Sequence, residues 1–147
     1  MRAHERIPLP DERAGAALAG AIAAALPAGA LLVLTGPLGA GKTSFVRHLA
    51  RALGSQAEVT SPTYALVHEY PTPAGTLVHV DAYRLPEAAT LQALGLDELC
   101  QQARLTVVEW GEALLEERPE AYHLALDRAG DPAVALHGAT WRRPPGR

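Results

Sequence analysis

The chain has little cysteine and no long uninterrupted apolar run. Its single cysteine, Cys100, cannot form an intrachain disulfide, which favours a reducing compartment where the thiol fills space in the core. The longest apolar stretch, residues 14–33, is broken by Gly20, Pro27 and Gly29, so it does not predict a membrane span. The first ten residues carry charges and two prolines in place of a signal core. We therefore expect a cytoplasmic protein without membrane contact.

Basic charge is also scarce. The 147 residues hold 13 Lys+Arg against 16 Asp+Glu, a formal net charge of −3. Proteins with a broad nucleic-acid footprint usually carry a basic face, which this composition does not supply. Twelve of the basic residues are arginine, and Lys42 is the one lysine. A chain that uses arginine elsewhere indicates that position 42 requires a compact ammonium group on a flexible stem.

The chain does have enough apolar material for one core, since 48% of its residues are hydrophobic. Hydrophobic periodicity and turn residues predict one domain over residues 1–141, with a disordered tail at 142–147. The predicted helices are residues 11–26, 42–53, 87–101 with an interruption near Gly95, and 111–117. The predicted strands are residues 31–35, 64–70, 76–81, 105–109, 121–127 and 133–137. The short connector at 71–75 makes the second and third strands an antiparallel hairpin.

Residues 36–43 match the pattern G-x-x-x-x-G-K-[ST] without a mismatch. They are Gly36, Pro37, Leu38, Gly39, Ala40, Gly41, Lys42 and Thr43. The glycines let backbone N–H groups turn toward phosphate oxygens, and the following helix directs the positive end of its dipole at the same anion. A buried strand before the loop and a helix after it argue against a simple glycine-rich turn. We predict that this loop and Ser44 bind ATP or ADP, in a three-layer P-loop NTPase-like α/β fold with a mixed central sheet flanked by helices.

Side chains on the loop and at two strand ends predict a Mg²⁺ site. Lys42 is placed to reach the β- and γ-phosphates, and the Thr43 hydroxyl to bind the metal. Asp81 ends an apolar run in the manner of a Walker B strand, and Glu109 ends another such run, so either carboxylate can hold the metal or orient a water. Each has a plainer alternative, a strand-ending turn for Asp81 and a solvated strand terminus for Glu109. Trp110 either packs in the core, shields the site or stacks on a base.

The loop at Ser61, Pro62 and Thr63 is rich in hydroxyl groups. In P-loop GTPases a threonine loop at this place senses the γ-phosphate and the metal, so Thr63 is predicted as a switch residue, with a simple turn as the alternative. Arg84 approaches a phosphate or forms a surface salt bridge. His48, on the helix after the phosphate loop, is expected on the partly exposed surface.

Several of these segments together resemble one family, the TsaE (YjeE) family of small bacterial P-loop ATPases. Residues 38–45 are similar to its Walker A segment, and residues 59–67 to its S-P-T-[YF] segment. Residues 79–85 are similar to its H-x-D-x-Y-R-L segment, and residues 108–110 to its V-E-W. Order and spacing agree over residues 5 to about 127, and the combination is far more specific than a phosphate loop alone.

The resemblance implies a protein that binds ATP with Mg²⁺, hydrolyses it slowly and associates with the TsaB–TsaD pair. That pair, with TsaC, makes the threonylcarbamoyl modification (t6A) of adenosine 37 in tRNAs reading ANN codons, so contact with tRNA is only indirect. The implied roles are phosphate and metal binding for Lys42 and Thr43, metal or water for Asp81 and Glu109, and the switch for Ser61 and Thr63. Trp110 is then expected near the nucleotide.

One position departs from the family pattern. The family usually has a threonine early in the first helix, where this chain has Ala14 or Gly15, so we expect no hydroxyl contact to the nucleotide there.

Two other functions use the same phosphate loop. A small P-loop kinase with its own acceptor needs an acceptor pocket and usually an arginine-bearing lid, whereas the arginines after Arg84 are isolated at 104, 118 and 128. A nucleotide-dependent binding module with negligible turnover is the remaining alternative, because binding and slow hydrolysis require the same residues.

Overall fold

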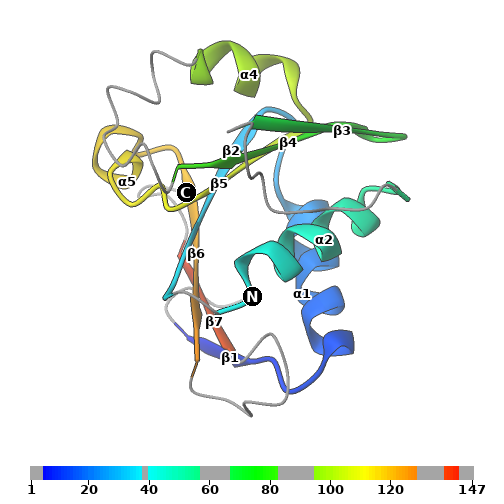
Figure 1. Ribbon diagram of the computed structural model, residues 1–147, viewed down its shortest axis with the longest axis vertical. Coiled ribbons are helices and arrows are strands. Elements are labelled where there is room, and N and C mark those ends of the chain that lie inside the picture. Colours follow the sequence, from blue (N-terminus) through cyan, green and yellow to red (C-terminus); the bar gives the residue numbers. More distant parts are fainter. Residues whose placement is uncertain (1–4, 38–39, 57–66, 83–94, 129–137, 143–147) are drawn as a thin grey trace.

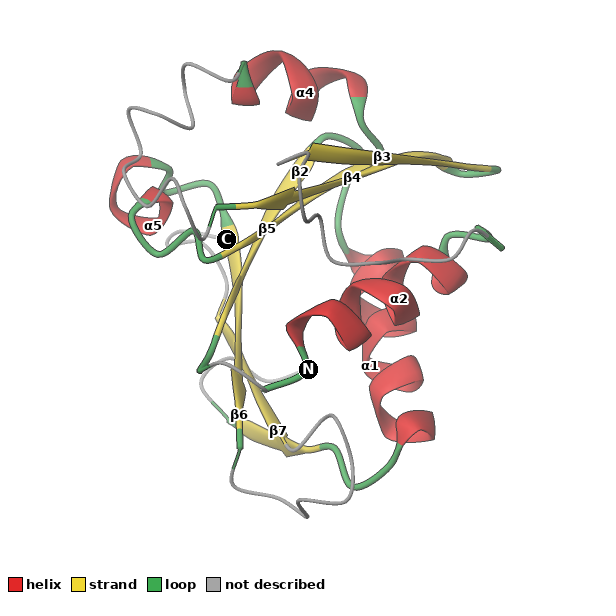
Figure 2. Ribbon diagram, viewed as in Figure 1, coloured by secondary structure: helices red, strands yellow, loops and turns green. Residues whose placement is uncertain are grey.

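A seven-stranded mixed sheet forms the centre of the computed structural model, which describes residues 5–37, 40–56, 67–82, 95–128 and 138–142. The described helices are α1 (Glu12–Ala25), α2 (Lys42–Ala52), α4 (Leu96–Gln102) and α5 (Leu114–Glu117). Figure 1 shows α1 and α2 on one face of the sheet and α4 and α5 on the other. The same three layers are seen by element type in Figure 2. The predicted α/β architecture is confirmed.

The order of the strands explains why several predicted site residues meet. The strands are β1 (Arg6–Pro8), β2 (Ala30–Thr35), β3 (Val67–Thr72), β4 (Gly75–Asp81), β5 (Leu105–Glu109), β6 (Tyr122–Asp127) and β7 (Gly138–Arg142). Their spatial order is β1-β7-β6-β2-β5-β4-β3. The central strands β6, β2, β5 and β4 are parallel, and the pairs at the two edges are antiparallel. Parallel strands bring their carboxyl ends to one edge of the sheet, so β2, β4 and β5 end side by side.

The two faces of the sheet bury separate apolar cores. Alternate residues of each strand point to opposite faces. In β2, Leu32 and Leu34 join the core beneath α1 and α2, whereas Leu31 and Val33 join the core beneath α4 and α5. All six residues of β2 are buried, as expected for a central parallel strand. Within the described ranges, no helix is long and apolar enough to cross a membrane.

Helix α1 begins at the residue that its sequence predicts. The Asp11 side chain caps the helix by accepting a hydrogen bond of 2.8 Å from the backbone N–H of Ala14. The prediction that His48 lies on a partly exposed surface is wrong. Helix α2 turns His48 toward α1, where the residue is 7% exposed and its Nε2 lies 2.7 Å from Oε2 of Glu12.

The ends of the sheet hold the main differences from the predicted elements. The hairpin of β3 and β4 and the strand at 105–109 are confirmed. The short strand β1 was not predicted, and it pairs with β7. The second closing strand, β7, runs from Gly138 to Arg142, and Arg142 pairs with His123, so the strand includes the first residue of the predicted tail. Residues 133–137, predicted as a strand, and residues 143–147 lie outside the described residues.

Candidate nucleotide site

The predicted phosphate loop joins β2 to α2 at the carboxyl edge of the sheet. Strand β2 ends at Thr35, and Gly36 follows with φ +143°, a conformation that L side chains rarely adopt. Gly41 is the N-cap of α2 with φ +91°, and Lys42 opens the helix. Ala40 is buried, Ser44 lies half-buried in the first turn of α2, and Leu38 and Gly39 lie outside the described residues. The predicted order of strand, loop and helix is confirmed.

Lys42 is held inside this loop. Its side chain donates hydrogen bonds to the backbone carbonyls of Gly36, at 2.6 Å, and Pro37, at 3.2 Å. The residue is 6% exposed. Burial lowers the pKa of the Lys42 ammonium, and the nearby carboxylates of Glu109, Glu112 and Asp81 oppose that shift. A cation so placed, among backbone dipoles and at the start of a helix, is suited to an anionic ligand.

Trp110 contacts the same ammonium group. The Lys42 Nζ atom lies 3.8 Å from the centre of the Trp110 ring, which is the geometry of a cation–π interaction. Trp110 follows β5 directly and has φ +62°, the left-handed region that non-glycine residues seldom occupy. This sharp turn at the strand end brings the ring back over Lys42, so Trp110 lies beside the phosphate loop.

The strand-end carboxylates meet next to the loop. Asp81 and Glu109 are paired in the parallel register of β4 and β5. Glu109 is 3% exposed, so the alternative of a solvated strand terminus is wrong. The Thr43 hydroxyl lies 3.5 Å from Oε1 of Glu109, which brings the first turn of α2 against the end of β5.

The donors at this edge suit Mg²⁺ bound together with a phosphate. Thr43, Asp81 and Glu109 offer hydroxyl and carboxylate oxygens, the ligands that Mg²⁺ prefers. In the described ranges, no group of three or more His, Cys, Asp or Glu side chains is placed to hold a metal ion. Mg²⁺ in nucleotide sites commonly takes only one or two carboxylates, with phosphates and water as the other ligands. The residues present therefore fit a metal that arrives with a nucleotide.

The sequence prediction missed His79 as part of this site. His79 is fully buried on β4, and its Nε2 contacts Oε2 of Glu109. The signal was present in strand alternation, because His79 and Asp81 are two residues apart on one strand and so point to the same face. Ser61, Thr63 and Arg84, the predicted switch residues and phosphate contact, lie outside the described residues.

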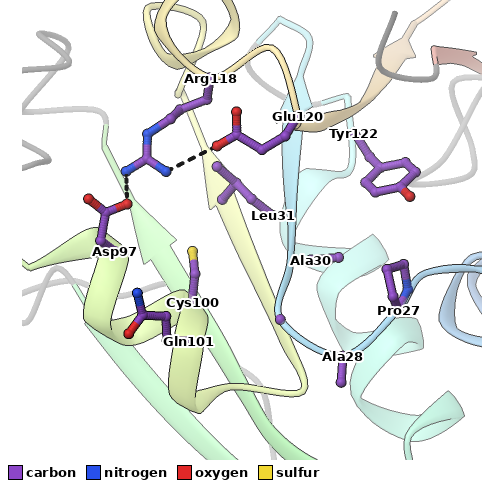
Figure 3. A pocket seen from close by; sticks show the side chains of 11 residues that line it. Pro27, Ala28, Ala30, Leu31, Asp97, Cys100, Gln101, Arg118, Glu120 and Tyr122 are labelled. Carbon is purple, nitrogen blue, oxygen red and sulfur yellow. Dashed lines mark hydrogen bonds and ion pairs between the residues drawn. The ribbon is translucent and has the colours of Figure 1, made fainter. Parts of the chain in front are cut away.

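A pocket of about 470 Å³ opens at the opposite end of β2. Figure 3 shows the side chains that line it, among them Cys100, Leu31 and Arg118, which is hydrogen-bonded to Glu120 and Asp97. Ala30, the first residue of β2, lines this pocket, whereas Gly36 follows the last residue of the same strand. The pocket therefore lies apart from the phosphate loop.

Strand, loop, helix and the adjacent strand-end carboxylates together define an α/β protein of the P-loop fold. The crystal structure of YdiB from Bacillus subtilis has the same fold, with a TM-score of 0.72 and 29% sequence identity over 95% of this chain and 85% of that one. The family model of threonylcarbamoyl adenosine biosynthesis protein TsaE matches residues 9–133. The chain therefore belongs to the TsaE family, and the resemblance seen in its sequence segments is confirmed.

Individual relatives agree with this assignment. The tRNA threonylcarbamoyladenosine biosynthesis protein TsaE of Streptomyces coelicolor is 43% identical over 124 residues, which are 81% of this chain and 83% of the relative. The protein of the same name from Bacillus subtilis is 38% identical over 116 residues, which are 78% of this chain and 72% of the relative.

Proposed function

We propose that this protein is a cytoplasmic, Mg²⁺-dependent ATPase of low turnover that supports threonylcarbamoylation of adenosine 37 in tRNA by acting on the TsaB–TsaD pair. Membership of the TsaE family supports a role in t6A biosynthesis. The observation that carries the ATPase proposal is the meeting of Thr43, at the start of α2, with the buried carboxylate of Glu109. A phosphate loop alone would bind an anion, whereas a carboxylate beside its metal-binding hydroxyl adds the group that hydrolysis requires.

Each residue then has a definite task. Lys42 and the N-terminal N–H groups of α2 bind the phosphates of ATP or ADP, and Trp110 covers the lysine. Thr43 and Asp81 hold Mg²⁺, which neutralises phosphate charge when bound. Glu109 holds the metal or orients the attacking water. Thr63 acts as the predicted switch.

The test is the rate of ATP hydrolysis, measured with and without the TsaB–TsaD pair. The chain alone should turn over slowly, and the pair should change that rate. Lys42→Ala, Glu109→Gln and Asp81→Asn should each lower the rate by about 100-fold or more, as expected when a group that stabilises a phosphoryl transition state is removed. Arg51→Ala is the matched control, because Arg51 is exposed in the last turn of the same helix. Unchanged turnover in the two carboxylate variants would contradict the metal assignment.

The same measurement separates ATPase from kinase. A kinase would transfer phosphate rapidly and stoichiometrically to one member of a panel of small acceptors, and that result would overturn the proposal. Two arginines that could serve a lid are engaged elsewhere, since Arg104 donates to the carbonyl of Ala23 and Arg118 binds Asp97 and Glu120. Nucleotide binding without any turnover, even with TsaB–TsaD present, would instead favour a binding module.

A further inference from the structure

His79 is a fully buried histidine that lies two residues before Asp81 on β4. In the parallel register of β4 and β5, His79 is opposite Val107 and Asp81 is opposite Glu109. His79 and Glu109 are thus diagonal neighbours, and both belong to the face of the sheet that α2 covers, as Leu77 and Val107 do. His79 therefore contacts the candidate nucleotide site through the Glu109 carboxylate.

The contact indicates which ring nitrogen of His79 donates the hydrogen bond. Nε2 of His79 contacts Oε2 of Glu109, and an ionised carboxylate only accepts hydrogen bonds, so Nε2 is the donor. Nδ1 is buried and has no hydrogen-bond partner among the described residues. A buried N–H without an acceptor is costly, so a ring that carries its hydrogen on Nε2 and none on Nδ1 suits both contacts.

The two carboxylate oxygens of Glu109 therefore have different partners. Oε2 accepts from His79, and Oε1 faces the Thr43 hydroxyl at 3.5 Å. A carboxylate held at one oxygen by a buried ring cannot rotate freely about its last side-chain bond. The other oxygen is kept at the edge where α2 begins, which is where the metal and the attacking water of the proposed reaction belong.

We propose that His79 is a positioning residue, which holds the Glu109 carboxylate in the orientation required for hydrolysis and does not itself touch the nucleotide. This inference rests on the proposed ATPase function. Without the ring, Glu109 remains buried beside Lys42, whose positive charge already interacts with it. The carboxylate can then turn toward that cation, and orientation is lost while the phosphate loop remains.

The experiment compares ATP turnover of the full chain with His79→Leu and His79→Gln. His79→Leu should lower kcat by about 10- to 100-fold, the usual effect of removing a residue that orients a ligand to a metal. The KM for ATP and the affinity for Mg-ADP should stay within about threefold, because the groups that bind phosphate are intact. His79→Gln should restore most of kcat, because its amide nitrogen can donate from nearly the position of Nε2. An equal decrease of kcat in the two variants would overturn the proposal. So would an increase in KM with kcat unchanged.

His68→Leu is the matched control. His68 lies opposite His79 on β3, and its ring contacts the Tyr70 hydroxyl at 3.1 Å instead of Glu109. The turnover of the His68→Leu variant should equal that of the wild type. An effect as large as that of His79→Leu would show that any change in this hairpin disturbs the site, and the positioning role would be rejected.

A second measurement does not depend on activity or on a nucleotide. The ¹⁵N NMR spectrum of the wild-type side chains should show His79 protonated at Nε2, and Glu109→Gln should shift that signal strongly. An Nδ1-protonated ring, or a signal insensitive to Glu109→Gln, would refute the contact even if His79→Leu failed to fold. The two hypotheses fail differently: a wild-type protein without turnover defeats the ATPase proposal, whereas an active His79→Leu variant defeats only the positioning role.

Discussion

Replacing Gly36 with alanine tests whether the first glycine of the phosphate loop is required by the fold itself. Gly36 has φ +143°, and a Cβ added to it would lie 2.5 Å from the backbone carbonyl oxygen of Leu126. Leu126 cannot move away easily, because it lies in β6 and pairs with Ala139 of β7. The new methyl group must therefore strain the loop or displace a sheet strand.

The expected loss of folding stability in Gly36→Ala combines two effects. Unfavourable backbone geometry costs about 1–3 kcal/mol, and forcing an atom into a packed interior costs about 1–3 kcal/mol more. Domains of this size are stable by only about 5–15 kcal/mol. At about 2–4 °C per kcal/mol, Gly36→Ala should lower the melting temperature by roughly 4–24 °C.

The assay is thermal and urea unfolding followed by circular dichroism, with Gly20→Ala as the control. Gly20 lies within α1, and apart from its chain neighbours and the adjacent helix backbone, no atom of the described residues lies within 4 Å of the Cβ that would be added there. That substitution should raise stability by about 0.5–1 kcal/mol, since alanine loses less backbone entropy in a helix. A Gly36→Ala variant that melts within about 2 °C of the wild type would show that the loop tolerates a side chain at this position.

Three further predictions concern stability and reactivity. Asp11→Ala should lower the free energy of unfolding in urea by about 1 kcal/mol, because it removes the acceptor for the Ala14 backbone N–H at the start of α1. Asp11→Ser should lower it little, and equal losses in the two variants would contradict the capping role. Burial, with a smaller effect of Arg142, lowers the pKa of His123 from 6.5 to about 4, so the unfolded chain binds the proton more tightly and stability falls as the pH drops from 6.5 to 4. His123 is partly exposed, so we expect the wild type to lose about 1–2 kcal/mol more than His123→Gln over this range; identical pH profiles would exclude the effect. Burial also raises the pKa of the Cys100 thiol, so iodoacetamide should modify it slowly at pH 8 until urea unfolds the chain, and equal rates would disprove its protection.

Local rules were sufficient for the parts of the site that are contiguous in the chain. The loop at Gly36, the N-cap at Asp11 and the strand that ends at Glu109 depend on backbone geometry and neighbouring residues, and the structure has each of them where the sequence predicts. The antiparallel hairpin of β3 and β4 belongs to the same group, because a connector of a few residues leaves the chain no other arrangement.

Contacts between side chains of separate helices and strands could not be predicted from these local rules. His48 was expected at the surface, but the packing of α2 on α1 buries it against Glu12. Strand β1 pairs with β7, and the Arg6 guanidinium on β1 binds both carboxylate oxygens of Asp127, which lies far along the chain on β6. Neither contact leaves a periodic signal in the sequence, since each depends on how two distant segments approach.

The phosphate loop, its single lysine and the carboxylates that end the two strands could be located from the amino-acid sequence alone. These follow from composition and from spacing along one segment, which local sterics and hydrogen bonding control. Two contacts depend on the folded chain: Trp110 turns back over Lys42, and His79 contacts Glu109. The first requires a positive φ after β5, and the second requires the register between two strands that lie far apart in the chain. Register and backbone turns are set by the packing of the whole sheet, so they appear only when the chain has folded.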